Sequence, residues 1–321
     1  MPRLLVFNPE HDYALAHGGD FYTPPVSVKT LAEKLELVPL SWAEGNDFIL
    51  LHNDSIVKAS EPNKVLDRDK AVASVLSIEP WGWDNALSHR LRLLGVAERL
   101  LPEKAYIESL RRLSHRRISI AANKALNAPS VPREFSSIVE ALNFYDENQG
   151  CFFKMPWSSG GRGVLATEEL THSQVTEWVR GAIRRQGSVM GEIGVRKIID
   201  FASLWHVDRM KVTFLGLSVY RCDGRGKYDG NISDSQENLF KIIRDAVPSF
   251  SREYIERQKI FIGSFIAPVY QGHLGIDMMG DIEGKVFPCV EINLRRTMGH
   301  VAMAQYRNHN PSFRHHNVSF K

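Results

Sequence analysis

The chain has 321 residues, of which 43% are hydrophobic and 24% charged, as in ordinary globular proteins. This length exceeds one small hydrophobic core and indicates two or three lobes of roughly 100–200 residues each. The net charge of +3 is too small to predict a nucleic-acid partner. The three cysteines are far apart and form no CxxC pair, which argues against a disulfide framework or a zinc site and favours a cytoplasmic protein.

The first apolar run is short. It covers residues 4–7 and ends at Asn8-Pro9. A signal peptide needs an apolar run of about 7–15 residues, and a transmembrane helix needs about 20. We therefore predict a buried strand here, followed by a polar loop, and no membrane partner.

Residues 1–113 have the pattern of an α/β lobe. A second strand is predicted over residues 47–52. A helix is predicted over residues 84–95, with Asp84 as its N-cap and Gly95 as its stop signal. Strands that alternate with helices favour a parallel sheet.

Two further units follow. Residues 114–188 begin with a predicted helix capped by Ser114, and a later helix starts near Thr171 and ends at Gly187. Residues 189–321 are richer in strands and include a polar loop at 222–235. The last residues, from 307 on, are polar and show no periodicity.

A glycine-rich loop follows the apolar strand that ends at Lys154. Glycine lets backbone N–H groups approach an anion, and the hydroxyl and cationic side chains add donors. The sequence lacks the GKS or GKT of a Walker loop and continues into another strand-like run. This favours a hairpin folded over phosphates, and the alternative is a plain hairpin turn with a charged tip. The candidate phosphate ligands are Lys154, Ser158, Ser159, Gly160, Gly161, Arg162 and Gly163.

Three oxygen-bearing side chains lie in a predicted hairpin near the C-terminus. Asp277 can lie across from Glu291, and Asn293 shares the face of Glu291 because successive side chains on a strand alternate. Two carboxylates and an amide oxygen suit Mg²⁺, which also neutralises their repulsion. Pro288 indicates an edge strand or a bulge. The alternative is an amphipathic hairpin with a solvated acidic face.

Arg295 follows Asn293 by two residues and therefore lies on the same predicted face. A guanidinium beside phosphates can stabilise the charge that develops in phosphoryl transfer. The alternative is an ion pair with a nearby acid. Arg296 points the other way if the strand continues.

These features together resemble the ATP-grasp superfamily. The segment 115–135 resembles its first helix and turn, 152–164 its lysine strand and phosphate loop, and 275–295 its metal-binding strands with the D…ExNxR pattern. The resemblance covers about residues 114–305. It implies a fold of α/β and α+β type in which two α+β lobes sandwich ATP and an N-terminal α/β lobe precedes them.

The resemblance also implies roles for single residues. Lys154 would contact the α- and β-phosphates, and the loop would cover the phosphates through its backbone N–H groups. Asp277, Glu291 and Asn293 would hold Mg²⁺, with Mn²⁺ as an alternative ion. Glu192 would contact adenine or ribose, and Lys197 and Asp200 would face the nucleotide. The family's further basic residue would be Arg117 or Arg116, between which the sequence does not decide.

The implied reaction activates a small-molecule or peptide carboxylate as an acylphosphate, which an amine or a thiol then attacks. Lys154 and Arg295 would be catalytic. Weaker candidates for substrate binding are Arg209, Arg296 and His300 for an anion, and His11 and Asp12 for an amine. For the last two, the alternative is capping and turn hydrogen bonds. A homodimer is compatible with the sequence.

Two other functions remain open. A small-molecule kinase with this fold would leave the phosphate on a hydroxyl acceptor and would need no amine. A non-catalytic nucleotide-binding module is the third reading, and the intact set of three metal-ligand candidates argues against it.

Overall fold

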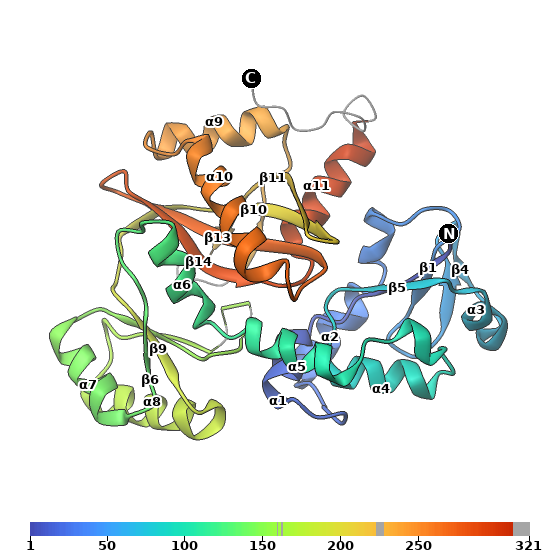
Figure 1. Cartoon of the computed structure of the whole chain (residues 1–321), viewed down its shortest axis with the longest axis horizontal. Coiled ribbons are helices and arrows are strands. Elements are labelled where there is room, and N and C mark those ends of the chain that lie inside the picture. Colours follow the sequence, from blue (N-terminus) through green and yellow to red (C-terminus); the bar gives the residue numbers. More distant parts are fainter. Residues whose placement is uncertain (159, 162, 223–227, 311–321) are drawn as a thin grey trace.

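A computed structural model describes residues 1–158, 160–161, 163–222 and 228–310 of the chain. Its strands form three separate sheets, and each sheet has its own helices (Figure 1). The first sheet lies on one side of the molecule, and the other two lie together on the opposite side (Figure 1).

The N-terminal lobe has the sheet order β4-β3-β2-β1-β5. Strand β1 pairs in parallel with β2 and β5, while β3 and β4 are antiparallel, so the predicted parallel sheet is confirmed for β2, β1 and β5 only. Successive apolar side chains of β1 pack on opposite faces, with Leu4 in one cluster and Leu5 in another. The elements of this lobe are β1 (Arg3–Val6), α1 (His11–His17), α2 (Val26–Lys34), η1 (Val38–Ser41), β2 (Phe48–Leu50), β3 (Ile56–Lys58), β4 (Glu61–Val65), α3 (Arg68–Ser74), β5 (Ser77–Pro80), α4 (Asn85–Leu93), η2 (Glu98–Leu100) and α5 (Lys104–Leu113).

Several helices begin or end at the capping residues that the sequence predicts. Asp84 caps α4 by accepting the Leu87 N–H at 2.8 Å. Thr171 and Gln174 form a capping box on α8, and Gly187 ends that helix at a positive φ of 83°. The prediction for Ser114 was wrong: this residue is the C-cap of α5, because the chain turns through residues 115–117 before α6 begins.

The second sheet has the order β6-β9-β7-β8 and packs against α7 and α8. Strand β9 hydrogen-bonds to both β6 and β7. The lobe boundary predicted after residue 188 would therefore separate β9 from the sheet to which it belongs. In the structure this lobe includes β9, whose last residue is Glu192. The elements are α6 (Ile118–Ala125), β6 (Arg133–Phe135), α7 (Ile138–Glu147), β7 (Phe152–Lys154), β8 (Val164–Ala166), α8 (His172–Gln186) and β9 (Val189–Glu192).

The third sheet is antiparallel, with the order β12-β11-β10-β13-β14. One face packs on the largest hydrophobic cluster, in which Trp205, Ile276 and Ile292 are buried. The helix α6 also packs on β14, so it belongs to this core although it precedes the second sheet. The elements are β10 (Lys197–Asp208), β11 (Lys211–Cys222), β12 (Tyr228–Asn231), α9 (Gln236–Ala246), α10 (Arg252–Phe261), the π-helix η3 (Ile262–Ile266), β13 (Gly272–Asp281), β14 (Val286–Asn293) and α11 (Met298–His309).

Strand β14 is an edge strand with an irregular register, as Pro288 predicts. Asp277 pairs with Glu291, but Met279 pairs with Phe287. Four residues of β14 thus span two residues of β13. The bulge carbonyls are bonded by buried amides: Gln258 donates to Pro288 O at 2.8 Å, and Asn123 donates to Cys289 O at 2.7 Å.

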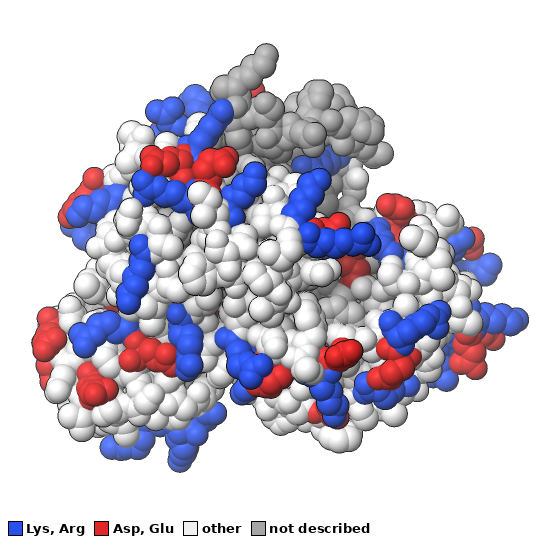
Figure 2. Space-filling view, in the orientation of Figure 1, with Lys and Arg blue, Asp and Glu red and all other residues white. Residues whose placement is uncertain are grey.

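The charged surface is mixed. On the face shown in Figure 2, basic and acidic side chains lie interspersed over all three lobes. Within the described residues, no helix has the length and apolarity to cross a membrane.

Gly280 tests the packing of β13. A Cβ at this position would overlap the side chain of Val247, which is fully buried. We expect Gly280→Ala to lower the free energy of unfolding by about 1–3 kcal/mol, measured by urea denaturation. Gly45→Ala is the control, because a Cβ there meets nothing within 4 Å. Equal unfolding midpoints for the two variants would contradict the position of β13.

Candidate functional site

Asp277 and Glu291 face each other on adjacent strands. They are register partners of β13 and β14, and their face is opposite to that of the buried pair Ile276 and Ile292. Asn293 Nδ2 donates to Asp277 Oδ2 at 3.0 Å. The three predicted metal ligands therefore converge, as the hairpin argument expects.

Burial and the neighbouring Glu291 both perturb the titration of Asp277. Burial raises the pKa of Asp277 to about 7, and the charge of Glu291 adds to this, while Arg295 and the Asn293 amide act in the opposite direction. A cation at this position would favour the ionised form of Asp277. The described residues contain no cluster of three or more His, Cys, Asp or Glu side chains suited to a metal. The candidate set is two carboxylates and one amide, which fits an ion such as Mg²⁺ that keeps other oxygen ligands.

Lys154 lies at the end of β7, and its side chain reaches Glu192 at the end of β9. Its Nζ donates to Glu192 Oε2 at 2.5 Å, and the two side chains are 12% and 17% exposed. Strands β7 and β9 are neighbours, which places both residues in the same sheet. Lys154 and Glu192, which the sequence analysis both assigns to nucleotide binding, thus contact each other.

The glycine-rich segment folds back on its own strand. Met155 N–H donates to Gly163 O at 2.7 Å. Gly163 has a φ of 70°, and a Cβ there would lie 2.8 Å from the Ser158 Cβ, so both conformation and space require glycine. Gly160 and Gly161 also have positive φ. The predicted ligands Ser159 and Arg162 lie outside the described residues.

Arg116 connects this loop with the carboxylate pair. Its guanidinium donates to Ser158 Oγ at 2.6 Å, to Met155 O at 2.6 Å and to Glu291 Oε1 at 2.6 Å. The neighbouring Arg117 is 59% exposed and bonds Glu134 at 2.8 Å. The geometry therefore favours Arg116 over Arg117 as the basic residue of the site. The sequence offered both, because the rotation of the short turn before α6 depends on packing.

A cavity that is partly open to solvent lies between β9, the segment before β6, and the hairpin of β13 and β14. Its space of about 350 Å³ includes the part open to solvent, and its lining combines apolar and polar groups. Such a composition suits a planar, partly polar ring. Glu192 reaches the cavity, whereas Lys197 and Asp200 pair with each other at 2.6 Å at the start of β10. The lining residues are Asn123, Ser130, Val131, Pro132, Glu192, Ile193, Val195, Met279, Phe287, Cys289 and Val290.

The N-terminal lobe reaches the same region through two ion pairs. Arg295 donates from Nε to Asp12 Oδ2 at 2.9 Å. Arg296 bonds Glu79, and its guanidinium lies over the Trp42 ring at 4.4 Å from the centroid. The alternative that Arg295 forms an ion pair with an acid is thus realised here, by an acid of another lobe.

Three weaker candidates do not join the site as substrate ligands. His11 is buried with its ring against Gly82 and its Nδ1 at 3.6 Å from Asp84, so it helps to pack the lobe. His300 is 1% exposed and closes the capping box of α11 with Thr297. Arg209 lies in the exposed turn between β10 and β11, far along β10 from the partner of Asp277. Their positions could not be read from the sequence, because burial and turn location are tertiary properties.

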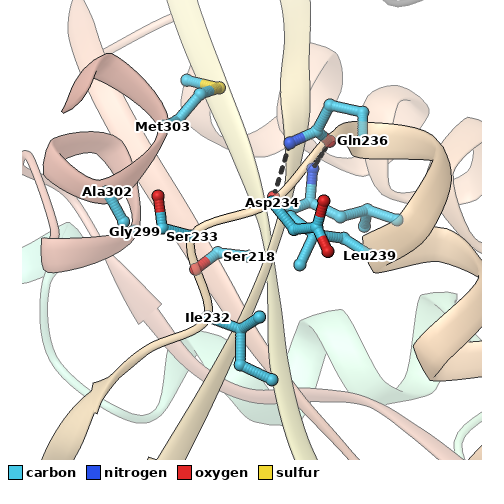
Figure 3. A pocket seen from close by; sticks show the side chains of 10 residues that line it. Ser218, Ile232, Ser233, Asp234, Gln236, Leu239, Gly299, Ala302 and Met303 are labelled. Atoms are coloured by element: carbon cyan, nitrogen blue, oxygen red, sulfur yellow. Dashed lines mark hydrogen bonds between the residues drawn. The ribbon is translucent and has the colours of Figure 1, made fainter. Parts of the chain in front are cut away.

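A second hollow of about 200 Å³ lies between β11, α9 and α11 (Figure 3). Its polar groups are bonded internally. Gln236 accepts the Leu217 N–H at 2.6 Å and donates to Leu217 O at 3.0 Å (Figure 3). Ser218 accepts from Asn231 at 2.7 Å. These bonds support the bulge of β11 at Gly216, where a Cβ would collide with Gln236.

Comparisons with known proteins give a match in fold. No family model matches the chain, and no curated protein matches it. The biotin carboxylase of Campylobacter jejuni, solved as a β-γ-ATP complex, has a TM-score of 0.55 at 13% identity, over 96% of this chain and 67% of that chain. D-alanyl-alanine synthetase A of Vibrio cholerae has a TM-score of 0.52 at 15% identity, over 99% and 94%.

A third solved structure is similar to the same extent. The biotin carboxylase domain of the Hydrogenobacter thermophilus 2-oxoglutarate carboxylase, in complex with MgADP, ADP and bicarbonate, has a TM-score of 0.54 at 15% identity, over 95% of this chain and 68% of that chain. At these identities the likeness establishes the fold, and the reaction has to be argued from the site.

The raised pKa of Asp277 makes a prediction for stability without divalent cations. Between pH 4 and 7 the folded chain keeps a proton on Asp277 that the unfolded chain has released. A rise in pH through this window therefore lowers the free energy of unfolding, by up to about 4 kcal/mol from this group. We expect Asp277→Asn to remove this part of the pH dependence in urea denaturation with EDTA.

The control is Asp245→Asn, which changes an exposed aspartate on α9. Parallel stability-against-pH curves for wild type and Asp277→Asn would contradict the buried carboxylate pair.

Proposed function

We propose that this chain, which has the ATP-grasp fold, uses Mg-ATP to activate a carboxylate as an acylphosphate for attack by an amine. The observation that carries the proposal is the convergence of two lobes on one point. Arg116 bonds the phosphate loop and Glu291 at the same time, and Glu291 faces Asp277. The loop and the carboxylate pair come from different sheets, so their meeting is not a by-product of one hairpin.

The residues of the site suit a nucleoside triphosphate. The cavity beside Glu192 would take the base, and Lys154 and Arg116 would bind the phosphates, for which each has to leave its present carboxylate partner. The glycines of the loop leave the backbone N–H groups accessible to phosphate oxygens. The nucleotide complexes of the similar biotin carboxylases support this assignment.

Asp277, Glu291 and Asn293 would hold Mg²⁺. Bound there, the ion would neutralise charge on the phosphates and on the two carboxylates. Arg295 stands next to this set and would stabilise charge on the carboxylate substrate. In the reaction the carboxylate oxygen attacks the γ-phosphorus, ADP leaves, and the amine then displaces phosphate. The chain's own contribution is position and charge, and no side chain has to act as a nucleophile.

A kinase on the same fold is the second candidate. It would use the same nucleotide site and leave a stable phosphorylated product. Asp12 already pairs with the guanidinium of Arg295, so an acceptor that takes the place of Asp12 would have to be anionic, which favours a carboxylate over a neutral hydroxyl.

Glu291→Gln tests the metal assignment. The substitution keeps the shape of the side chain and removes one anionic ligand. We expect ADP release from Mg-ATP to fall at least about 100-fold and the thermal stabilisation by Mg-ATP to disappear. The control is Glu283→Gln, which removes an exposed carboxylate from the tip of the same hairpin. Full activity in Glu291→Gln would remove Glu291 from the metal site.

Arg116→Ala and Arg117→Ala distinguish the two adjacent arginines. Arg116 is buried between the loop and Glu291, whereas Arg117 is largely exposed. We expect Arg116→Ala to weaken ADP binding about 10- to 100-fold in calorimetry, the range for loss of a charged hydrogen bond, and Arg117→Ala to change it less than about threefold. The reverse order would return the assignment to Arg117.

A further inference from the structure

The bulge in β14 separates two stretches of the hairpin that have different registers. Near the turn Met279 pairs with Phe287, and beyond the bulge Asp277 pairs with Glu291. The extra residues therefore shift the far stretch of β14 by two positions relative to the stretch near the turn. This shift brings Glu291 to its place opposite Asp277.

The same hairpin without the bulge would have a regular register. If the pairing near the turn simply continued, Cys289 would lie opposite Asp277, and Glu291 would lie opposite Gly275. Glu291 would then be displaced by two residues along the strand, which is about 7 Å. Two ligands of one Mg²⁺ ion cannot be this far out of place, because each Mg²⁺–oxygen bond is only about 2.1 Å long. The candidate metal site therefore depends on which register β14 adopts.

The burial of apolar side chains does not distinguish the two registers. A shift by two residues leaves each side chain on its own face of the sheet. Ile292 would stay on the core side and would lie opposite Leu274 in place of Ile276, and both of these partners are fully buried aliphatic residues. Among the described strands, β14 also has only β13 as a neighbour, because it is at the edge of its sheet. Another interaction has to fix the register.

Two buried amides bind the bulge from helices that pack on the sheet. Gln258 of α10 donates to Pro288 O at 2.8 Å, and Asn123 of α6 donates to Cys289 O at 2.7 Å. Gln258 is 0% exposed and Asn123 is 3% exposed. A buried carbonyl that leaves the strand ladder needs another donor. The two amides therefore replace hydrogen bonds that the bulge disrupts.

Both amides are oriented by contacts of their own. Gln258 Oε1 accepts from Ser203 Oγ at 2.7 Å, and Ser203 Oγ accepts from Trp205 Nε1 at 2.8 Å. Asn123 Nδ2 also donates to Ser119 O at 2.9 Å, one turn earlier in its helix. Each amide is thus held independently of β14 and presents a donor where the bulge presents a carbonyl.

We propose that Gln258 and Asn123 are positioning residues for the candidate metal site, because they select the bulged register and so keep Glu291 opposite Asp277. The inference rests on the proposed function and adds to it two residues that act through the backbone of β14. Successive carbonyls of a strand point to opposite sides. A regular ladder would therefore turn one of the two bulge carbonyls toward β13 and leave a buried amide without its acceptor, which penalises the regular register.

Disulfide formation in protein without nucleotide or metal can report the register. Cys222 lies close enough to Asp277 to interact with its charge, so both reporters carry Cys222→Ser. The first adds Asp277→Cys, which in the regular register places a thiol opposite the native Cys289. The second adds Asp277→Cys, Glu291→Cys and Cys289→Ser, and it reports the bulged register. Opposite residues of an antiparallel pair have Cα atoms about 4.5–5.5 Å apart, which suits a disulfide.

Gln258→Met tests the inference, because it keeps the length of the side chain and removes the amide. With Gln258 in place, we expect mild oxidation to cross-link the second reporter much faster than the first. Gln258→Met should raise the cross-linking rate of the first reporter about tenfold, the value of one buried hydrogen bond left unmade, and lower that of the second. Mass spectrometry measures both rates.

Gln236→Met is the matched control. Gln236 likewise bonds the backbone beside a bulge of this sheet, but on β11. Its substitution should leave both cross-linking rates unchanged. Where Gln258→Met does not fold, Asn123→Leu carries the same test at the other bulge carbonyl. Unchanged cross-linking rates in the folded variant would overturn the inference.

The Mg²⁺ dependence of ADP release provides a second measurement, in the chain without reporter substitutions. A change of register withdraws Glu291 from the metal, so Gln258→Met should raise the Mg²⁺ concentration for half-maximal ADP release about tenfold. A loss of folded protein alone would lower kcat at every Mg²⁺ concentration and leave this midpoint unchanged. A fall in kcat with an unchanged midpoint would therefore contradict the positioning role.

The two measurements also separate this inference from the proposed function, since cross-linking requires neither nucleotide nor metal. A changed register in Gln258→Met, together with a wild type that releases no ADP from Mg-ATP, supports the selection of register by the amides and removes the proposed reaction. Mg-dependent ADP release with the same register in all variants leaves the proposed function standing and removes the inference.

Discussion

The repulsion between Asp277 and Glu291 is the constraint to which the surrounding structure responds. The strand register holds the two carboxylates opposite each other, and Asp277 is buried away from water that could screen its charge. Three features of the chain itself reduce this repulsion: a proton retained by Asp277, the Asn293 amide, and the two guanidinium groups of Arg116 and Arg295. A divalent cation would be a fourth, and a stronger one than any of the three.

The two guanidinium groups also join the lobes around this point. Arg116 joins the glycine-rich loop of the second sheet to Glu291, and Arg295, two residues beyond the end of β14, joins this region to Asp12 of the N-terminal lobe. The three sheets therefore meet where the charge is concentrated. Ligands that carry their own charges could enter here only by replacing these contacts, so the ion pairs mark the positions that a nucleotide and a substrate would occupy.

The sequence predicted the site best where strand periodicity alone determines which side chains share a face. The two-residue spacing of Glu291, Asn293 and Arg295 and the length of the hairpin before them were enough to place Asp277 opposite Glu291. Helix ends with clear caps, such as Asp84 and Gly187, were also predicted correctly. These signals are local, because each depends on a few neighbouring residues.

The features that the sequence left open or predicted wrongly depend on tertiary packing. Whether Arg116 or Arg117 faces the site depends on how the chain turns between α5 and α6. The burial of His11 and His300 depends on neighbours that are remote in sequence. Strand β9 joins the second sheet by pairing with residues 36 to 58 positions earlier, from the pair Lys154 and Met190 to the pair Arg133 and Gly191.

The bulge in β14 has a consequence for how this site tolerates change in length. Its surplus over β13 is an even number of residues, so Phe287 and Glu291 stay on one face, the first beside the cavity that Glu192 reaches and the second beside Asp277. Loss of a single residue between them would rotate Glu291 toward the position of Ile292 in the hydrophobic core and bring an aliphatic side chain next to Asp277. Loss of two would keep both on the same side. Insertions and deletions in this strand should therefore survive in related chains only in pairs.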